Sequence, residues 1–555
     1  MNLTAFSYWA DAWPFVDAMK HTDPWISGRP EHPDPNRRWD DGTRLPCDAH
    51  GWVQRLEPGQ VARKIIFGQD THFRPGRYTV LYQGKGQLEY RGSVTEIERS
   101  PGKDTFLLGP GSLLLELTQT DPTDPLRDVH ILPGGGRCGT EGNRLCDSDA
   151  ACGGARCETF VSTYKTRPFH PEFLADISSA KVLRFMDWMD TNRPGQPGEG
   201  EVVPPPRVEW SDWPTAEDAE YFPIPFDLII ALAKETNAEP WITIPHAASN
   251  DLVRRIAEKF ARELPETLRL HVEYSNEVWN PGFGQFYFAA AQGCRRFAEK
   301  PTECDDDGDG VLCEPGPWTE TMAACTKYGR RFHALRTAEV QRIFMQAFGA
   351  QASSRLVRVV AWQLGSMGDH EIELLRASVL GRPLSRWVDV FAVAPYFGVG
   401  IDHMPSADAF FARVDRETFG APKGTFRILA SSLDGNEPGT YAWLANDVKQ
   451  LRELKDLSHL RLVAYEGGQH LFSFFDGEGP KIRALNEDPR MEAVYLDFLG
   501  HFSRLTDDGL FVHFQSPGGW WKHGTFGSKA WQGQPLSQTP KERALLKFAA
   551  GKTSK

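Results

Sequence analysis

The stretch LRLHVEYSNEVWNP, residues 268–281, begins as an apolar strand and ends in polar and aromatic side chains. Its first half is rich in Leu and Val, as buried strands are. Its second half places an amide, Asn276, directly before a carboxylate, Glu277, where the strand is expected to end. If other strands of the chain end in the same way, their polar ends would meet at one edge of a sheet.

From about residue 170 the chain repeats one unit seven times, an amphipathic helix followed by a short apolar strand. The predicted helices are 170–180, 226–237, 249–265, 337–349, 369–381, 441–457 and 491–509. The predicted strands are 181–188, 240–246, 268–277, 355–363, 387–396, 460–468 and 510–519. Short runs of Val, Ile and Leu that alternate with helices are typical of parallel strands buried on both faces.

An eighth strand is predicted at residues 2–9 and a last helix at 541–551. Eight strands and their helices predict an α/β fold of the (β/α)8 TIM barrel type. A doubly wound open sheet is the alternative, because it would not need the first strand to pair with the last.

Residues 41–137 depart from this repeat and show short alternating strands broken by Gly and Pro, which predicts an antiparallel β-rich insertion. Residues 1–40 then hold the first strand and the start of the first β/α unit, 138–165 a Cys-rich loop, and 166–555 the rest of the barrel. Within that last part, 294–325 is a second Cys- and Asp-rich loop. Residues 13–22 are either the first helix or part of a loop, and this decides whether the insertion covers the C-terminal face of the barrel or lies to its side.

The nine cysteines form two local groups of four with one left over, Cys47. The groups are Cys138, Cys146, Cys152 and Cys157, and Cys294, Cys304, Cys313 and Cys325. Such clusters in short loops predict disulfides in an exported protein, with the pairing left open. Zinc binding is the alternative, and the absence of paired C-x2-C spacing weakens it.

The composition limits the kinds of partner that we expect the protein to bind. The net charge of −12 gives no electrostatic basis for binding nucleic acid or an anionic membrane, and no run approaches the length of a membrane span. The first residues, MNLTAFSYWADAW, lack the regions of a signal peptide, so we expect a secreted or extracytoplasmic monomer whose signal is not part of this sequence. The 17 Trp and 34 Phe either line a binding surface or fill a large core.

Two of the predicted strands end in a glutamate at similar depth, the fourth at Glu277 and the seventh at Glu466. In a barrel the active site lies at the C-terminal ends of the strands. Two carboxyl groups about 5 Å apart are what retaining glycoside hydrolysis requires, one as nucleophile and the other as acid and then base. Their roles need opposite protonation, so their surroundings should differ.

With these residues in place, the barrel part of the chain, roughly two thirds of it, resembles the clan A retaining glycoside hydrolases, which include the cellulases and mannanases of family 5. In that clan an Asn-Glu pair ends strand four, which Asn276 and Glu277 match. The resemblance implies that Asn276 binds the sugar 2-hydroxyl and Glu277 is the acid/base. It implies that Glu466, at the end of strand seven, is the nucleophile.

The resemblance extends to supporting residues. It implies that Arg184 keeps the nucleophile ionised, that Tyr396 donates a hydrogen bond to it, and that His246 stands near them. Trp520 or Trp521 would form the floor of the −1 subsite, and the subsite candidates on other strand ends are Asp187, Trp188 and Trp279. Related enzymes often have His-x-Tyr on strand six, whereas this chain has Ala394-Pro395-Tyr396, which favours a divergent or separate family.

The acidic stretch CDDDGDGVLC places Asp305, Asp307 and Asp309 before Gly310, as at the start of a calcium loop. The twelfth position is Gly316, so a complete EF-hand is excluded. We expect either a structural Ca²⁺ or a solvated acidic loop, and no cofactor for catalysis.

The sequence therefore predicts a retaining hydrolase that cleaves β-glycosidic bonds inside a polysaccharide or oligosaccharide. A barrel that binds carbohydrate without cleaving it is the first alternative. A transglycosylase is the second, because it would use the same residues and differ only in the acceptor.

Overall fold

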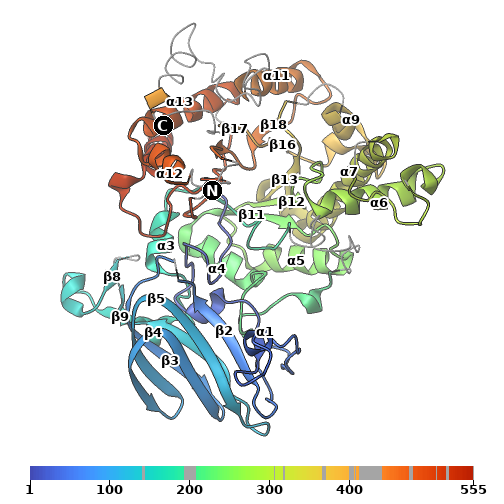
Figure 1. Ribbon diagram of the computed structural model, residues 1–555. Coiled ribbons are helices and arrows are strands. Elements are labelled where there is room, and N and C mark those ends of the chain that lie inside the picture. The colour runs from blue at the N-terminus through green and yellow to red at the C-terminus, as the bar shows by residue number, and fades with distance from the viewer. Residues whose placement is uncertain are drawn as a thin grey trace.

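The computed structural model describes residues 1–69, 71–139, 144–192, 208–305, 307–316, 319–365, 370–398, 406, 408–409, 411, 440–473, 479–507, 509–520 and 524–553. A curled parallel sheet forms its centre (Figure 1). The strands run in the order β10 (Val182–Arg184), β11 (Glu239–Ile244), β12 (Leu270–Tyr274), β13 (Leu356–Ala361), β16 (Val390–Val393) and β18 (Arg461–Ala464). All neighbours in this order are parallel, as the apolar runs predict.

Helices alternate with these strands and pack around the sheet. They are α3 (Pro171–Asp176), α4 (Phe226–Thr236), α5 (Asn250–Glu263), α7 (Glu320–Phe348), α9 (His370–Arg376), α11 (Thr440–Glu453) and α13 (Arg490–Leu505), with α14 (Pro540–Thr553) last. Helix α5 shows why they form, since Ser249 caps its first turn and its apolar side chains are buried on one face.

The structure shows six strands that form a half-barrel. It confirms only this part of the predicted eight-stranded barrel. The two segments expected as the first and eighth strands make single bridges at its edges, Asn2 with Arg184 and Phe511 with Ala464. They also meet each other, because the backbone N–H of Asn2 donates to the carbonyl oxygen of His513 at 2.8 Å.

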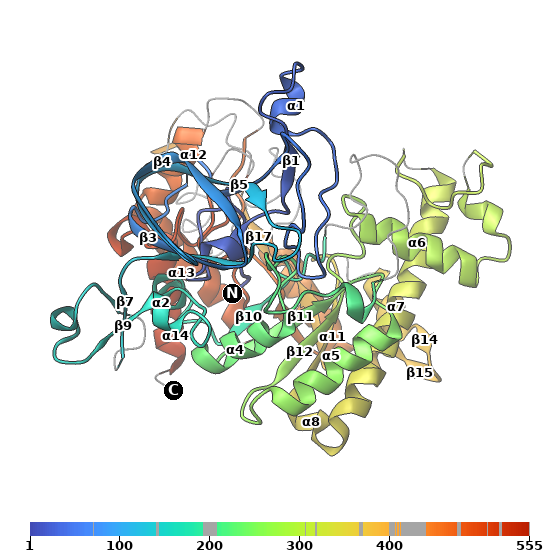
Figure 2. The ribbon, with the colours of Figure 1, turned by 90° about the horizontal axis from the view of Figure 1, so that it is seen from below.

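Residues 26–133 carry the antiparallel insertion. Its strands are β1 (Ile26–Gly28), β2 (Val61–Phe67), β3 (Gly76–Gln83), β4 (Gly86–Ser100), β5 (Lys103–Thr120) and β6 (Arg127–Pro133). They enclose a hydrophobic cluster of their own. Residues 13–22 form only a short 3-10 turn at Ala18–His21, so the loop alternative holds there. The insertion and the α6–α7 pair lie on different sides of the parallel sheet (Figures 1 and 2).

Three helical predictions need correction. Helix α6 (Gly284–Phe297) and the first half of α7 replace what was expected as loop, since Cys294 and Cys325 lie on these helices and only Cys304 and Cys313 lie between them. Helix α9 ends at Arg376, and the hairpin β14 (Ser378–Val379) and β15 (Arg382–Pro383) follows, with Gly381 at φ +84° in its turn. The remaining short helices are α1 (Asn36–Trp39), α2 (Phe160–Thr163), α8 (Ala352–Arg355) and α12 (Gly479–Glu487).

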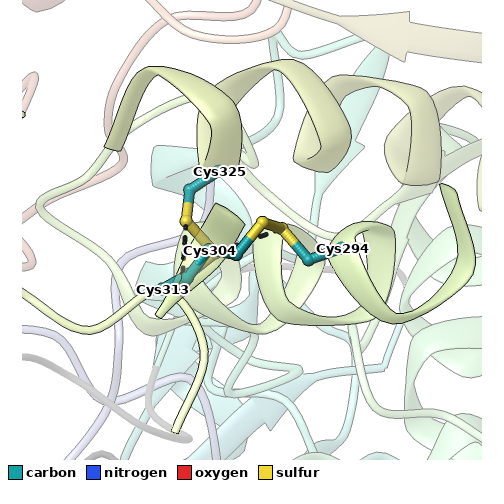
Figure 3. A group of neighbouring side chains, drawn as sticks. All are labelled: Cys294, Cys304, Cys313 and Cys325. Carbon is teal, nitrogen blue, oxygen red and sulfur yellow. Dashed lines mark hydrogen bonds between the residues drawn. A yellow bond between two sulfur atoms is a disulfide. The ribbon is translucent and has the colours of Figure 1, made fainter. Parts of the chain in front are cut away.

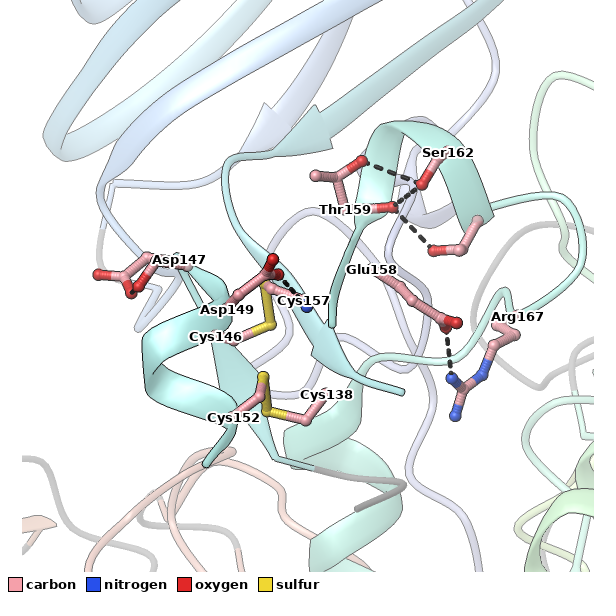
Figure 4. Close-up of a disulfide and its surroundings, with 12 residues drawn as sticks. Cys138, Cys146, Asp147, Asp149, Cys152, Cys157, Glu158, Thr159, Ser162 and Arg167 are labelled. Atoms are coloured by element: carbon pink, nitrogen blue, oxygen red, sulfur yellow. Dashed lines mark hydrogen bonds and ion pairs between the residues drawn. A yellow bond between two sulfur atoms is a disulfide. The ribbon is translucent and has the colours of Figure 1, made fainter. Parts of the chain in front are cut away.

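Four disulfides form within the two cysteine groups. Cys138–Cys152 joins the strand β7 (Gly136–Cys138) to a 3-10 helix at Asp149–Cys152, and Cys146–Cys157 joins the strands β8 (Leu145–Cys146) and β9 (Cys157–Thr159) (Figure 4). Cys294–Cys304 and Cys313–Cys325 connect α6 and α7 to the segment between them (Figure 3). This confirms the disulfide interpretation over zinc and leaves Cys47 as an exposed free thiol. Within the described residues, no helix has the length and apolar character needed to cross a membrane.

Candidate active site

The polar ends of strands β10, β12 and β18 converge on one buried guanidinium group, that of Arg184. Its Nη2 donates to Asn276 Oδ1 at 2.7 Å, and its Nη1 lies 3.3 Å from Glu466 Oε2. Arg184 is fully buried. These contacts bring together three residues from sequence positions far apart, as the strand-end argument predicts.

Arg184 has a closer acidic partner than Glu466. Its Nη2 lies 2.9 Å from Glu273 Oε2, and the indole N–H of Trp241 donates to the same oxygen at 2.8 Å. Glu273 lies inside β12 and is 2% exposed. The cation of Arg184 is therefore shared between two carboxylates, one within a strand and one at a strand end.

Glu466 also accepts a hydrogen bond from the Tyr396 hydroxyl, at 2.9 Å. The pairing of β17 (Tyr396–Phe397) with β19 (Gly468–Gln469), directly beyond β16 and β18, brings these residues together. Gly468 is at φ +130°, and a Cβ there would lie 2.8 Å from the Tyr495 hydroxyl. The chain therefore needs glycine at this turn to hold its tight path after Glu466.

Glu277 sits on strained backbone and accepts two hydrogen bonds. Ser275 and Glu277 have φ values of +60° and +41°, which are uncommon for residues with a side chain. The Tyr465 hydroxyl donates to Glu277 Oε1 at 2.8 Å, and Asn280 Nδ2 donates to Glu277 Oε2 at 2.7 Å. This local geometry aims the carboxyl group of Glu277 back toward the end of β18.

The carboxyl groups of Glu277 and Glu466 lie close enough for their charges to interact. Burial and the charge of Glu277 raise the pKa of Glu466 to about 8, although Arg184 opposes this. Burial also raises the pKa of Glu277. Two carboxylates this close cannot both be ionised at low cost, so the pair holds one proton near neutral pH.

The contacts of this site do not by themselves put the shared proton on Glu277, where the retaining mechanism needs it. The pKa of Glu466 is raised although Glu466 is the carboxyl group in contact with Arg184, whereas the mechanism needs the proton on Glu277. We assign one proton to the pair as a whole, because coupled groups titrate together. Burial raises the pKa of the nearby Asp187 to about 6, so that carboxyl is also easily protonated.

Three residues of this site were not predicted from the sequence: Glu273, Tyr465 and Asn280. Glu273 carried a usable signal, because a charged residue inside an apolar strand needs a buried partner. Tyr465 and Asn280 carried none, since a tyrosine or asparagine beside a strand end is common in any fold.

Asn276 contacts Arg184 and faces protein atoms, whereas His246 packs against an aromatic ring. Asn276 is 2% exposed, and its Nδ2 donates to Asn192 Oδ1 at 3.0 Å while its Oδ1 accepts from Arg184. His246 packs against Phe288, and neither of its ring nitrogens has a partner among the described residues. Burial lowers the pKa of His246 to about 4, so its ring is neutral.

Two of the tryptophans that were predicted as subsite residues are instead packed inside the protein. Trp188 is fully buried among aromatic rings and donates to the Thr4 carbonyl oxygen, which places it in the core rather than on an open cleft. Trp520 is 5% exposed, with the Lys541 ammonium 4.7 Å from its ring, so it too is packed inside. Trp279 is half-buried, and Trp521 lies outside the described residues. The aromatic surplus therefore fills core to a large extent.

The three carboxylates of Asp305, Asp307 and Asp309 do come together, with oxygens within 4.8 Å of one another. They accept backbone N–H groups of their own loop, for example Gly308 N to Asp305 Oδ1 at 2.8 Å. The group lies between the two disulfides that join α6 and α7 and contributes nothing to the Arg184 site.

Comparisons with known proteins are as follows. No family model matches the chain, and no curated protein matches it. A GH51 arabinofuranosidase structure from Xanthomonas axonopodis pv. citri is similar at 10% identity and a TM-score of 0.34, over 62% of this chain and 60% of that one. A GH51 alpha-L-arabinofuranosidase from Thermotoga petrophila RKU-1 is similar at 12% identity and a TM-score of 0.35, over 69% and 64%. A beta-glucosidase 1317 is similar at 11% identity and a TM-score of 0.31, over 68% and 86%.

Proposed function

We propose that the protein is a retaining glycoside hydrolase that cleaves β-glycosidic bonds within a polysaccharide, with Glu466 as nucleophile and Glu277 as acid/base. The observation that carries this proposal is the close approach of the half-buried carboxyl group of Glu277, just after β12, to the buried carboxyl group of Glu466, just after β18, which Arg184 and Tyr396 hold.

The close approach of the two carboxyl groups favours retention over inversion. Inverting enzymes separate them by about 6.5–9.5 Å to admit a water molecule, and retaining enzymes by about 5 Å. Two carboxyl groups near enough for direct electrostatic interaction fit the shorter separation better.

In the proposed reaction, Glu466 attacks the anomeric carbon while Glu277 gives its proton to the leaving oxygen. The bond between the anomeric carbon and the leaving oxygen breaks as the bond to Glu466 forms. Glu277, now ionised, takes a proton from water, whose oxygen attacks the same carbon and releases Glu466. Arg184 and Tyr396 favour the charged form of Glu466 at the start and end of this cycle.

In this proposal Asn276 binds the sugar 2-hydroxyl. It uses only the part of its side-chain amide that does not contact Arg184 or Asn192. Binding of the sugar between Glu277 and Glu466 separates the two carboxyl groups and weakens their mutual repulsion. The shared proton then goes to Glu277, because Arg184 stays with Glu466.

The wider setting belongs to the same proposal. We place the protein outside the cytoplasm as a monomer, an assignment that the four disulfides support. The bridges of residues 1–3 and 510–513 would close the half-barrel around the site. The reaction uses no cofactor, and a structural Ca²⁺ at Asp305, Asp307 and Asp309 remains a prediction.

Two alternatives are separated by one experiment. Release of reducing ends is measured on glucan, mannan, xylan and galactan for the wild type, for Glu466→Gln, and for Glu258→Gln, an exposed control on α5. We expect release from at least one polymer, loss of it in Glu466→Gln, and no change in the control. Binding without release by the wild type would identify a carbohydrate-binding protein, and products longer than the substrate would identify a transglycosylase.

A further inference from the structure

A cavity of about 990 Å³ lies between the β-rich insertion and the loop that follows β10. One wall comes from residues 24–60 and the other from residues 211–223. Neither Arg184, Glu277 nor Glu466 lines it, so it is a different site from the candidate active site. Its volume is in the range of pockets that hold small organic ligands.

The two walls are fixed to each other by direct contacts. Lys64 Nζ lies 2.8 Å from Glu220 Oε2, and the backbone N–H of Ala219 donates to the carbonyl oxygen of His50 at 2.9 Å. His50 Nδ1 also lies 2.8 Å from Asp218 Oδ1. A ligand would therefore enter a preformed cavity, which lowers the entropic cost of binding.

The acidic side chains that line the cavity already have partners. Asp218 pairs with His50 and Glu220 with Lys64. Asp48 accepts the backbone N–H groups of His50 and Trp52, Asp212 accepts that of Glu209, and Glu57 pairs with Arg29. Each of these carboxylates therefore already has at least one donor or cation beside it.

Three donors that line the cavity are unsatisfied among the described residues. The guanidinium groups of Arg44 and Arg55 are exposed, and no hydrogen bond or ion pair joins either of them to a described residue. The indole N–H of Trp25 is buried without a partner, while its ring is half-buried. The cavity thus offers two guanidinium groups and one indole N–H that have no partner among the described residues.

We propose that this cavity binds a saccharide that carries carboxylate groups, that is, uronic acid residues of a polysaccharide. The carboxylate would accept from Arg44 and Arg55, whose planar forks match its two oxygens. The Trp25 indole would give its N–H to a sugar oxygen and its ring to the apolar face of the sugar. The proposal rests on the proposed function, since it makes the cavity a second contact with the same class of polymer.

The test measures binding without turnover, in the Glu466→Gln background. Affinity electrophoresis at low ionic strength is run in gels that contain polygalacturonate or glucuronoxylan, with galactan and unsubstituted xylan as neutral counterparts. We expect an acidic polymer to retard the protein more than its neutral counterpart. Arg44→Gln/Arg55→Gln should raise the Kd for that polymer at least tenfold, and Trp25→Phe, which keeps the ring, several-fold.

The matched control is Arg37→Gln/Lys103→Gln, which removes the same charge from exposed positions of the insertion outside the cavity. Its binding should equal that of the parent, and thermal melting should show that all variants fold. Equal weakening in this control would overturn the proposal in favour of nonspecific charge attraction. Equal retardation by neutral polymers, or no retardation by either acidic polymer, would overturn it as well.

Failure of this proposal is distinct from failure of the proposed function. The Arg44→Gln/Arg55→Gln change in the wild-type background should leave hydrolysis of a short aryl glycoside unchanged, because the cavity lies apart from Glu277 and Glu466. A protein that hydrolyses such a substrate but shows no acidic preference would keep the catalytic proposal and lose this one.

Discussion

The molecule buries charge in two places, and the balance of charge differs between them. In the insertion, His130 lies between two aspartates, 2.7 Å from Asp17 Oδ2 and 2.9 Å from Asp128 Oδ1, with Lys20 nearby. At the strand ends, Glu273, Glu277 and Glu466 surround the single guanidinium group of Arg184.

The protonation of these groups follows from that balance. Hydrogen bonds with Asp128 and Asp17 raise the pKa of His130 to about 9 against the opposing effect of burial, so His130 is ionised near neutral pH beside two aspartates whose pKa is lowered. Burial raises the pKa of all three glutamates at the strand ends. The first cluster is matched and stabilises the fold, whereas the second carries more acid than it can ionise, which is typical of a catalytic site.

The largest expected effect comes from removing the two strand-end carboxyl groups. Glu466→Gln should abolish turnover of every substrate, because no nucleophile remains. Glu277→Gln should lower kcat/KM by about 10²–10⁴-fold on a polysaccharide, in line with the loss of a general acid. Formation of the glycosyl-enzyme from an aryl glycoside with a good leaving group should change much less, and stopped-flow release of the phenol checks this. Equal losses on both substrates would contradict the role of Glu277.

A second change tests the sharing of Arg184. In Glu273→Gln the guanidinium group of Arg184 interacts with one carboxylate instead of two, so the pKa of Glu466 should fall. The nucleophile must be ionised, and the acidic limb of the kcat/KM profile should therefore move to lower pH, by about 1 unit. A shift to higher pH would show that Glu273 supports the charge on Arg184 rather than competing for it.

The insertion cluster gives a smaller and purely structural effect. A histidine whose folded pKa of about 9 exceeds its unfolded value stabilises the fold fully below pH 6.5, and loses this contribution as the pH rises through 9. The free energy of unfolding should fall by roughly 3 kcal/mol across that range. Urea titrations at several pH values should show a fall in the wild type and in His32→Gln, a partly exposed control, that is larger than the fall in His130→Gln, where the raised pKa of Glu466 still contributes.

The smallest effect is expected at an exposed ion pair. Arg376 Nε lies 2.7 Å from Asp456 Oδ2, and both side chains are nearly half exposed. Arg376→Ala should change the free energy of unfolding by about 0.5 kcal/mol or less, because solvent screens such pairs. A larger loss of unfolding free energy in urea denaturation would mean that exposed and buried charges contribute more similarly to the stability of this protein than proposed.

Much of the parallel sheet was predictable, because its strands are short apolar runs between helices. The contacts of Glu466 with Arg184 and Tyr396 were predicted in kind from the resemblance, and the structure has both. The first half of α7 was missed because Cys313 and Cys325 were taken as marks of a loop. A helix can carry a disulfide at its N-terminal end, and spacing alone does not show this.

The details of the site depended on contacts that one sequence does not reveal. The sharing of Arg184 with Glu273 follows from the alternation of β12, which turns Glu273 to the same interior as Arg184. The packing of Trp188 and Trp520 follows from the arrangement of neighbouring helices and loops. Local residue patterns gave the position of each strand end but not the direction of each side chain.

The central claim is that Glu466 forms a covalent bond with the anomeric carbon and Glu277 then directs water to the same face. Proton NMR of the first product released from a polymer that the protein cleaves tests this directly, because the anomeric signal appears before mutarotation. The account predicts a product that keeps the β configuration of the substrate. An α product would contradict it, since inversion requires a water molecule where Glu277 and Glu466 lie close together.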